Sequence, residues 1–262
     1  MFNKFWFDAK NINCFKNGFE VIKDLNLKIT YSENVILIGP NGSGKSSLIE
    51  VINRNIYPVI TNDSKLKMFD KELINLWELR KRISTVNNDI KNRINPNLQV
   101  FDLILSGLYG RYCYIQNKAE RDYEKVEKIM KKMNMSNLSK KYFSYLSDGE
   151  KQITLIARAL IKNPDILILD EPIANLDYKS KFFVIDKINE ISKLNTKIFC
   201  VTHDISMITS VYDRIIMLKN GVIIAEGDQN KVINSENLNK LYGINVEVTK
   251  KNGFWTINRL TK

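Results

Sequence analysis

The chain has 262 residues, of which 44% are hydrophobic, and a formal net charge of +11. This length and apolar content are sufficient for one domain with a buried core and an embedded subdomain. Cys14, Cys113 and Cys200 lie far apart and form no C-x-x-C pair. This spacing argues against a disulfide framework and a zinc site, and it fits a reducing cytosol.

No apolar run approaches the ~20 residues needed to span a bilayer, so we expect the chain itself to be soluble. Asp8 and Lys10 interrupt the N-terminal stretch, which therefore lacks the apolar run of a signal peptide. The lysines are dispersed among acidic residues, so the positive charge does not form a binding stripe. We expect a cytoplasmic protein that makes no direct contact with nucleic acid.

Residues 1–85 are predicted to form an antiparallel sheet followed by a strand, a loop and a helix. Val35–Ile38 is an all-apolar run, which is typical of a strand buried on both faces of a parallel sheet. Gly39–Ser46 then matches G-x-x-x-x-G-K-[ST], and the apolar residues of Leu48–Ile52 repeat at helical spacing. The motif therefore lies between a strand and a helix, as it requires.

The chemistry of this loop is phosphate binding. Gly39, Gly42 and Gly44 allow unusual backbone angles, so that successive N–H groups can point at one anion, and the helix N-terminus adds partial positive charge. Lys45 can reach the β- and γ-phosphates, and the hydroxyl of Ser46 can bind Mg²⁺.

Residues from about 89 to 146 carry helical spacing and predict a helical subdomain; examples are Tyr123, Val126, Ile129 and Met130. Ser147 and Glu150 then form a capping box that opens the next helix. The apolar face of that helix comprises Ile153, Ile156, Ala157, Leu160 and Ile161.

A second buried strand ends in carboxylates. Ile166–Leu169 is apolar and is followed by Asp170 and Glu171. Ligands of open α/β sheets bind at the carboxyl ends of strands, so Asp170 is expected near Ser46 and the metal. Glu171 could orient or deprotonate an attacking water.

Strands and helices alternate over residues 150–230. One helix is predicted to contain Phe182, Ile185, Ile188 and Ile191. Met217–Asp228 is predicted to form a hairpin with Asn220 and Gly221 at its turn.

Five motifs in this order resemble those of the ATP-binding-cassette (ABC) ATPases. They are Gly39–Ser46 (Walker A), Leu146–Glu150 (signature), Ile166–Glu171 (Walker B and catalytic glutamate), Ala174–Asp177 (D-loop) and Val201–Asp204 (switch). The resemblance implies an α/β P-loop NTPase with a mainly parallel core sheet, an N-terminal antiparallel sheet and an inserted helical subdomain. By the same resemblance His203, the single histidine of the chain, contacts the γ-phosphate and steadies the attacking water.

The family pairs two such domains head to tail, so that Ser147 and its helix N-terminus face the γ-phosphate of the other subunit. The resemblance implies ATP and Mg²⁺ as ligands, with Lys45, Glu171 and His203 as catalytic residues. The metal-binding residues would be Ser46, Asn88 and Asp170. The nucleotide-binding residues would be Phe15, Gly39, Pro40, Asn41, Gly42, Ser43, Gly44, Lys45, Ser46, Ser47, Asn88, Ser147, Gly149, Glu150 and Asp177.

Two positions depart from the family pattern. Asp148 replaces the usual signature glycine; it either points away and favours the helix dipole, or weakens ATP binding in trans. Asn88 replaces the usual glutamine, which is one methylene longer. For adenine stacking we choose Phe15, with Phe19 second; the alternative is that Phe15 only packs in the N-terminal sheet.

The resemblance divides the single domain into a core (1–88 and 147–230), a helical subdomain (89–146) and a C-terminal extension (231–262). The tail has a Leu241–Gly243 helix end before a last strand, and it resembles the ATPase subunits of iron-chelate, haem and cobalamin importers. The stretch Val100–Tyr112 resembles the same subunits and also those of the related molybdate branch. The implied partners are a second, identical or closely related ATPase subunit, a membrane permease and a substrate-binding protein. The chain would then lie on the inner face of the cell membrane, with the surface around Asn88, Phe101 and Tyr109 against the permease.

Three alternatives stay open at this point. The chain could be a soluble ABC-type ATPase acting on nucleic acid, although it has neither the long coiled coil nor the second cassette of such relatives. It could be a slow ATP-binding switch, for which Asp148 and Asn88 are the motivation. It could also belong to an exporter.

Overall fold

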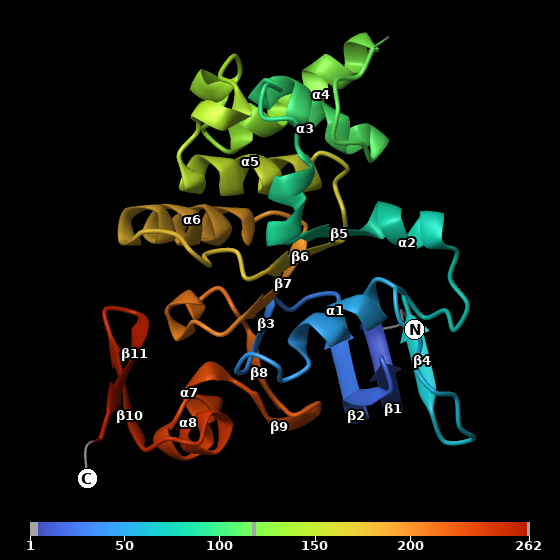
Figure 1. Ribbon diagram of the computed structural model, residues 1–262, viewed down its shortest axis with the longest axis vertical. Helices are drawn as coiled ribbons and strands as arrows, with labels where there is room; N and C mark the ends of the chain where they lie inside the picture. The colour runs from blue at the N-terminus through green and yellow to red at the C-terminus, as the bar shows by residue number, and fades with distance from the viewer. Residues whose placement is uncertain (1–4, 117–118, 261–262) are drawn as a thin grey trace. The chain divides into compact units, whose positions relative to one another are not determined.

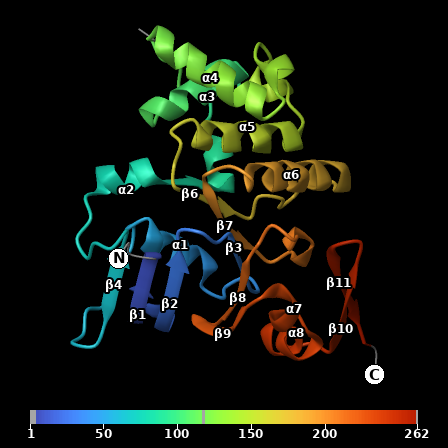
Figure 2. The ribbon, with the colours of Figure 1, turned by 180° about the vertical axis from the view of Figure 1, so that it is seen from behind.

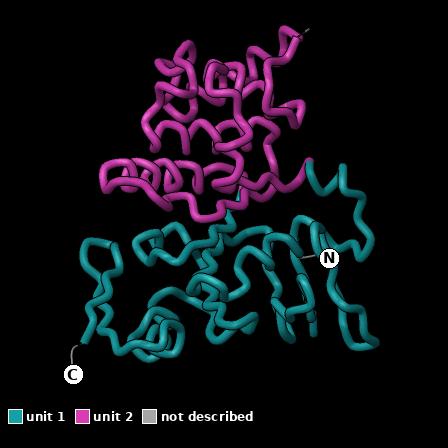
Figure 3. The backbone as a smooth tube through the Cα atoms, in the orientation of Figure 1, with its two compact units in different colours: residues 1–80, 197–262 teal, residues 81–196 magenta. Residues whose placement is uncertain are grey.

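The computed structural model describes residues 5–116 and 119–260 and divides the chain into two compact units. Unit 1 comprises residues 1–80 and 197–262, and unit 2 comprises residues 81–196 (Figure 3). Within the described residues, no helix is both long and apolar enough to cross a membrane.

Unit 1 begins with an antiparallel sheet of three strands in the order β2–β1–β4 (Figure 1). The strands are β1 (Phe5–Lys16), β2 (Phe19–Thr30) and β4 (Lys65–Met68). Asn17 and Gly18 connect β1 to β2 with φ of 51° and 81°, the backbone that a two-residue hairpin turn requires. The predicted N-terminal antiparallel sheet is confirmed.

The core strands of unit 1 are β3 (Val35–Ile38), β7 (Lys197–Thr202), β8 (Arg214–Lys219) and β9 (Val222–Gly227). The strand β3 lies between β7 and β8 and is parallel to both, whereas β9 is antiparallel to β8. All four residues of β3 are buried, as its apolar run predicts. The turn from β8 to β9 is Asn220–Gly221, with φ of 50° and 82°, so the predicted hairpin is confirmed.

The last part of unit 1 is visible from both sides in Figures 1 and 2. It comprises α7 (Gln229–Val232), α8 (Ser235–Tyr242), β10 (Val246–Lys251) and β11 (Phe254–Arg259). We expected one last strand, but β10 and β11 form a two-stranded antiparallel sheet. The reason is the Asn252–Gly253 turn, with φ of 51° and 83°; this dipeptide is a hairpin signal that the sequence analysis did not use.

Unit 2 contains the parallel strands β5 (Ile83–Val86) and β6 (Ile166–Asp170). Its helices are η1 (Asn88–Arg93), α3 (Val100–Tyr109), α4 (Glu120–Lys132), η2 (Ser136–Leu138), η3 (Phe143–Tyr145), α5 (Asp148–Leu160) and α6 (Tyr178–Ile191). The helix α2 (Leu76–Arg82) spans the boundary between the units in the sequence. The helices α3 and α5 pack closely at Gly107, where a Cβ atom would lie 2.3 Å from the carbonyl oxygen of Arg158.

The two helices predicted from these spacings are present, and in each the aromatic residue of the predicted set lies outside the buried stripe. In α4, Val126, Ile129 and Met130 are buried, but Tyr123 is exposed and stacks on Phe101 with ring centroids 5.6 Å apart. In α6, the three isoleucines are buried and Phe182 is 49% exposed. Both aromatic residues keep helical spacing, yet they lie at the edge of the buried stripe rather than within it.

Asn34 connects three segments of unit 1 at the start of β3. Its side chain is buried, its Oδ1 accepts a hydrogen bond from the Ile198 N–H at 3.0 Å, and its Nδ2 donates to the Val211 carbonyl at 3.1 Å. Its own N–H donates to the Asp213 carboxylate at 2.7 Å. One amide side chain therefore satisfies buried backbone groups of two neighbouring segments.

Replacing this side chain tests the packing of unit 1. Asn34→Ala leaves the Ile198 N–H and the Val211 carbonyl without their partner, so the free energy of unfolding should fall by about 2–4 kcal/mol. Urea denaturation followed by circular dichroism measures the change. Asn62→Ala, at an exposed position, should change the stability by less than about 0.5 kcal/mol. Equal stability of the two variants would contradict the role assigned to Asn34.

Candidate functional site

The loop after β3 closes on the ammonium group of Lys45. Gly42 and Gly44 have φ of +78° and +104°, which side-chain-bearing residues rarely adopt. Lys45 is only 7% exposed, and its Nζ donates to the carbonyl oxygens of Gly39 at 2.7 Å and Pro40 at 3.0 Å. The positive charge is thereby held inside the glycine loop.

The same loop is crowded by neighbouring backbone. A Cβ atom at Gly39 would lie 2.3 Å from the carbonyl oxygen of Leu218 in β8, and one at Gly44 would lie 2.7 Å from that of Val21 in β2. The Gly221 N–H donates to the Ser43 carbonyl at 2.8 Å, and the Gly221 carbonyl accepts from Lys23 at 3.0 Å. The glycines at 39 and 44 are therefore required by close approach, and strand β2 and the β8–β9 turn hold the loop in shape.

The helix α1 (Lys45–Ile52) follows the loop, and its N-terminus suits an anion. Its N-cap residue is Gly44, which makes no side-chain capping hydrogen bond, and its first turn carries no acidic residue. N–H groups of a first helical turn that lack a cap can donate to phosphate oxygens. Asn41, Gly42 and Ser46 are exposed, Ser47 is half-buried, and the hydroxyl of Ser46 is the oxygen ligand that the motif offers to Mg²⁺.

The aromatic candidates for adenine lie on the β1–β2 hairpin. Phe15 is 50% exposed and Phe19 is 76% exposed. The adjacent Lys16 forms an ion pair with Glu50 of α1 at 2.8 Å, which fastens this end of the hairpin to the helix after the loop. A half-exposed ring at position 15 is available for stacking, and its adenine role stays a prediction.

In unit 2, the carboxylates lie at the end of β6, where the chain turns sharply. Asp170 is the last residue of the strand, and Glu171 has a φ of +51°. The Glu171 carbonyl accepts hydrogen bonds from Nδ2 of Asn88 at 3.4 Å and from the Ala174 N–H at 3.2 Å. Asn88 thus lies beside the acidic turn despite its shorter side chain.

The helix α5 begins with the predicted capping box. The Ser147 N–H donates to the Glu150 carboxylate at 2.9 Å, and the Glu150 N–H donates to the Ser147 hydroxyl at 3.2 Å. The Asp148 side chain is 64% exposed and lies 3.4 Å from the Lys151 ammonium. A carboxylate in the first turn favours the helix dipole, which is the first of the two readings of Asp148.

Gly149 and Asp177 connect α5 to the start of α6. A Cβ atom at Gly149 would lie 3.2 Å from Cβ of Ser180, so glycine permits close helix packing here. Asp177 is the N-cap of α6 and accepts from the Ser180 N–H at 2.8 Å. This backbone hydrogen bond lowers the pKa of the Asp177 carboxyl, so the cap is present at neutral pH.

His203 follows β7 in unit 1 and is exposed. Its backbone carbonyl accepts a hydrogen bond from the Tyr242 hydroxyl at 3.1 Å. The next peptide N–H, of Asp204, donates to the Thr202 hydroxyl at 3.0 Å. The contact of Tyr242 with His203 is not foreseeable from the sequence, in which 39 residues separate them and the Leu241–Gly243 helix end is only a family likeness.

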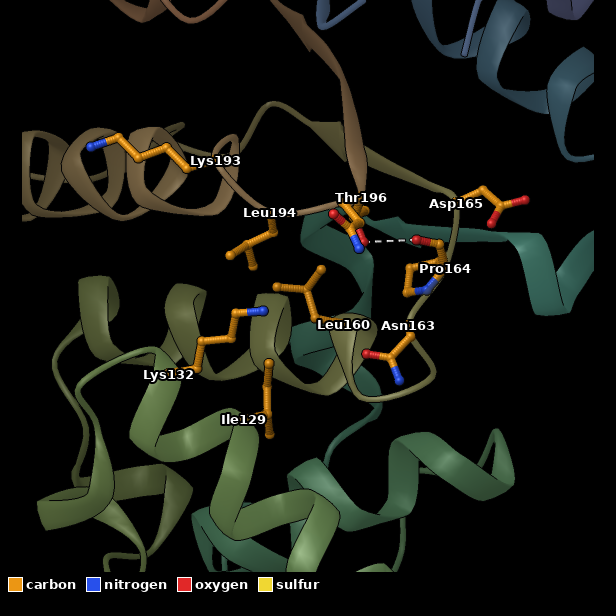
Figure 4. A pocket seen from close by; sticks show the side chains of 10 residues that line it. Ile129, Lys132, Leu160, Asn163, Pro164, Asp165, Lys193, Leu194 and Thr196 are labelled. Carbon is orange, nitrogen blue, oxygen red and sulfur yellow. Dashed lines mark hydrogen bonds between the residues drawn. The ribbon is translucent and has the colours of Figure 1, made fainter. Parts of the chain in front are cut away.

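A pocket of about 430 Å³ in unit 2 contains none of the predicted site residues (Figure 4). It is lined by Ile129, Lys132, Leu160, Asn163, Pro164, Asp165, Lys193, Leu194, Asn195 and Thr196. The Thr196 hydroxyl donates to the Pro164 carbonyl at 2.7 Å across it. This pocket is therefore separate from the motifs.

The oxygen atoms of the predicted metal-binding residues suit Mg²⁺. In the described part of the chain, no group of three or more His, Cys, Asp or Glu side chains could hold a metal ion. Mg²⁺ is usually held by one or two protein oxygens together with water and substrate phosphates. Ser46 of unit 1 and Asp170 of unit 2 each offer an oxygen of this kind.

Removing the enclosed ammonium tests the loop. Lys45→Ala should weaken MgATP binding by about 10- to 100-fold, because a charge-assisted hydrogen bond contributes about 1.5–3 kcal/mol. Isothermal titration calorimetry measures the affinity. Lys65→Ala removes an exposed lysine of β4 and serves as the charge-matched control. Unchanged affinity in Lys45→Ala would refute phosphate binding at this loop.

Comparison with known proteins gives the following matches. A family model described as ABC transporter matches residues 22–174. The uncharacterized ABC transporter ATP-binding protein YmeB of Lactococcus lactis subsp. lactis (strain IL1403) is 30% identical over 245 residues, which cover 92% of this chain and 93% of YmeB. The petrobactin import ATP-binding protein YclP of Bacillus subtilis (strain 168) is 29% identical over 246 residues, with 92% and 94% covered.

Solved structures agree with the fold. The cbiO1 protein from Clostridium perfringens, part of the ABC transporter complex cbiONQ, has a TM-score of 0.77 at 24% identity, and 91% of this chain and 94% of cbiO1 are covered. The dimeric ATP-binding cassette MJ0796 in a post-hydrolysis state with ADP and Pi has a TM-score of 0.67 at 25% identity, with 85% and 98% covered. The α/β P-loop fold predicted from the motifs is confirmed.

The region matched by the family model spans more than half of the chain. The alignment with YmeB covers 92% of the chain. The chain therefore belongs to the ABC transporter family, as the ATP-binding subunit of a transporter and an ATPase that works with ATP and Mg²⁺.

Proposed function

We propose that this subunit energises the import of an iron chelate, haem, cobalamin or a related metal compound through a separate membrane permease. One similarity to a curated relative supports this substrate class: YclP is a petrobactin import ATP-binding protein. The tail with Leu241–Gly243 and the stretch Val100–Tyr112 resemble the same branch. The chain would act on the cytoplasmic face of the membrane.

The position of the Lys45 ammonium is the main structural support for ATP hydrolysis by this chain. Its Nζ lies 2.7 Å from the Gly39 carbonyl oxygen, in a loop that leads into a helix without a side-chain cap. Lys45 and the loop N–H groups bind the phosphates. Ser46 and Asp170 would hold Mg²⁺, which supplies positive charge beside the phosphates. Glu171 takes the proton of the attacking water, and His203 steadies that water beside the γ-phosphate.

We further propose that two subunits share each ATP. Ser147 is exposed at the N-terminus of α5, so its hydroxyl and the first N–H groups of the helix can face a nucleotide bound to another subunit. The cassette MJ0796 is dimeric, which supports this arrangement. The partner is a second copy of the chain or a close relative, and a substrate-binding protein would deliver the cargo.

The proposed permease contact lies on unit 2, around Asn88, Phe101 and Tyr109. Tyr109 is 43% exposed, and its hydroxyl donates to the Asp122 carboxylate at 2.6 Å. This hydrogen bond lowers the pKa of Asp122 and holds the phenol ring in place. An anchored, partly exposed ring suits a binding surface, because little side-chain entropy is lost when a partner covers it.

Glu171→Gln tests transport function directly. The substitution removes the general base, so kcat should fall by at least about 100-fold while MgATP still binds. The variant, trapped with ATP in cells of the source organism, should co-purify with a polytopic membrane protein and a substrate-binding protein. Lys45→Ala/Glu171→Gln, whose affinity for MgATP should be lower by about 10- to 100-fold, should capture less of both partners. Soluble partners or nucleic acid instead would overturn the transport proposal.

Tyr109→Ala tests the permease surface. It should reduce capture of the permease by about tenfold, a loss of about 1.4 kcal/mol, while ATP binding by the purified subunit is unchanged. Tyr109→Phe separates the ring from its hydroxyl, and Tyr57→Ala, at a position 63% exposed in unit 1, is the control. Normal capture by Tyr109→Ala would count against this surface.

A further inference from the structure

The Leu241-Tyr242-Gly243 helix end has a structural explanation for each of its residues. Leu241 is 1% exposed and anchors α8 to unit 1. Gly243 ends the helix with a φ of +71°, the left-handed conformation that glycine favours. Tyr242 lies between them, is only half-buried, and donates its hydroxyl to the His203 carbonyl at 3.1 Å.

With this hydrogen bond, both polar groups of the peptide between His203 and Asp204 have a side-chain partner. The peptide between His203 and Asp204 has its oxygen bonded to Tyr242 and its N–H bonded to the Thr202 hydroxyl at 3.0 Å. On the far side, the Asp204 carboxylate accepts from the Ser206 N–H at 3.0 Å, which caps η4 (Ile205–Met207). A peptide plane held at both polar ends cannot rotate, so it restricts the backbone angles of His203.

The helix that carries Tyr242 is itself fixed within unit 1. Asn234 caps its start by accepting from the Asn237 N–H at 2.8 Å, and Oδ1 of Asn239 accepts from the Val246 N–H at 2.7 Å. The Lys219 ammonium of β8 donates to the Lys240 carbonyl. In addition, β11 contacts η4 directly. The C-terminal segment thus approaches the switch from α8 and from β11.

We propose that Tyr242 is a positioning residue for His203: its hydroxyl orients the 203–204 peptide and thereby holds the imidazole where the reaction needs it. The inference rests on the proposed role of His203 in hydrolysis. Preorganisation of a side chain that acts in the transition state raises kcat more than it changes substrate affinity. The C-terminal segment is therefore a functional part of the ATPase site.

Tyr242→Phe removes only the hydroxyl and keeps the half-buried ring. We expect kcat for ATP hydrolysis to fall by about fivefold, as for loss of one neutral hydrogen bond, and KM for MgATP to change by less than about twofold. Tyr57→Phe makes the same chemical change at an exposed ring of unit 1 and should leave both constants unchanged. Equal kcat in Tyr242→Phe and the wild-type protein would overturn the inference.

A double-mutant cycle shows whether Tyr242 acts through His203. In the His203→Ala background, Tyr242→Phe should produce no further loss of kcat, because the side chain that it positions is gone. A further fivefold loss would mean an independent effect and would overturn the inference. If His203→Ala alone left kcat unchanged, the proposed role of His203 would fail, and the positioning role would fail with it. If His203→Ala lowered kcat and Tyr242→Phe did not, only the positioning role would fail.

The single histidine of the chain provides a measurement that does not depend on turnover. In untagged, ¹⁵N-labelled protein, the imidazole nitrogen signals come from His203 alone. Tyr242→Phe should shift or broaden them, while Tyr57→Phe should not. Identical imidazole spectra for Tyr242→Phe and the wild-type protein would show that the hydroxyl does not position the ring.

Discussion

The crowding of backbone around the glycine loop is the constraint on which the rest of unit 1 depends. A Cβ atom at Gly39 would collide with the Leu218 carbonyl of β8, and one at Gly44 would collide with the Val21 carbonyl of β2. The N–H of Gly221 donates to the Ser43 carbonyl, and its carbonyl accepts from the Lys23 N–H. A loop enclosed in this way keeps its N–H groups in one direction without relying on side chains. The antiparallel sheet and the β8–β9 hairpin therefore act as the supports of the phosphate site.

The parts of the fold that depend on local chemistry could be predicted from the sequence. Strand β3 follows from an unbroken apolar run, the capping box of α5 from the spacing of Ser147 and Glu150, and the β8–β9 turn from Asn220–Gly221. Each of these is decided within about ten residues. The same chemistry at Asn252–Gly253 would have predicted the second strand of the tail.

Contacts between residues far apart in the chain could not be predicted from local sequence patterns. Nothing near Tyr242 indicates that its hydroxyl meets a carbonyl 39 residues away. The closeness of Asn88 to the Glu171 carbonyl joins positions 83 residues apart; it is expected from the family resemblance and not from local chemistry. Helical spacing correctly indicates the helix that carries Tyr123, but it does not show that Tyr123 is 42% exposed and stacks on Phe101. Spacing gives the face of a helix, whereas the neighbouring elements decide how wide the buried part of that face is.

The bonds that shape the glycine loop are made by main-chain atoms of Lys23, Ser43 and Gly221. Such a bond is indifferent to the side chain at position 23, which is half-buried, so mutation can replace that residue while the geometry of the loop persists; Ser43 is 2% exposed, so position 43 admits only a small side chain. Gly39, Gly44 and Gly221, where a Cβ atom would lie within 3 Å of backbone oxygen, are held to glycine. A lineage can therefore drift toward lysine and asparagine over most of its surface and still inherit the same phosphate-binding loop.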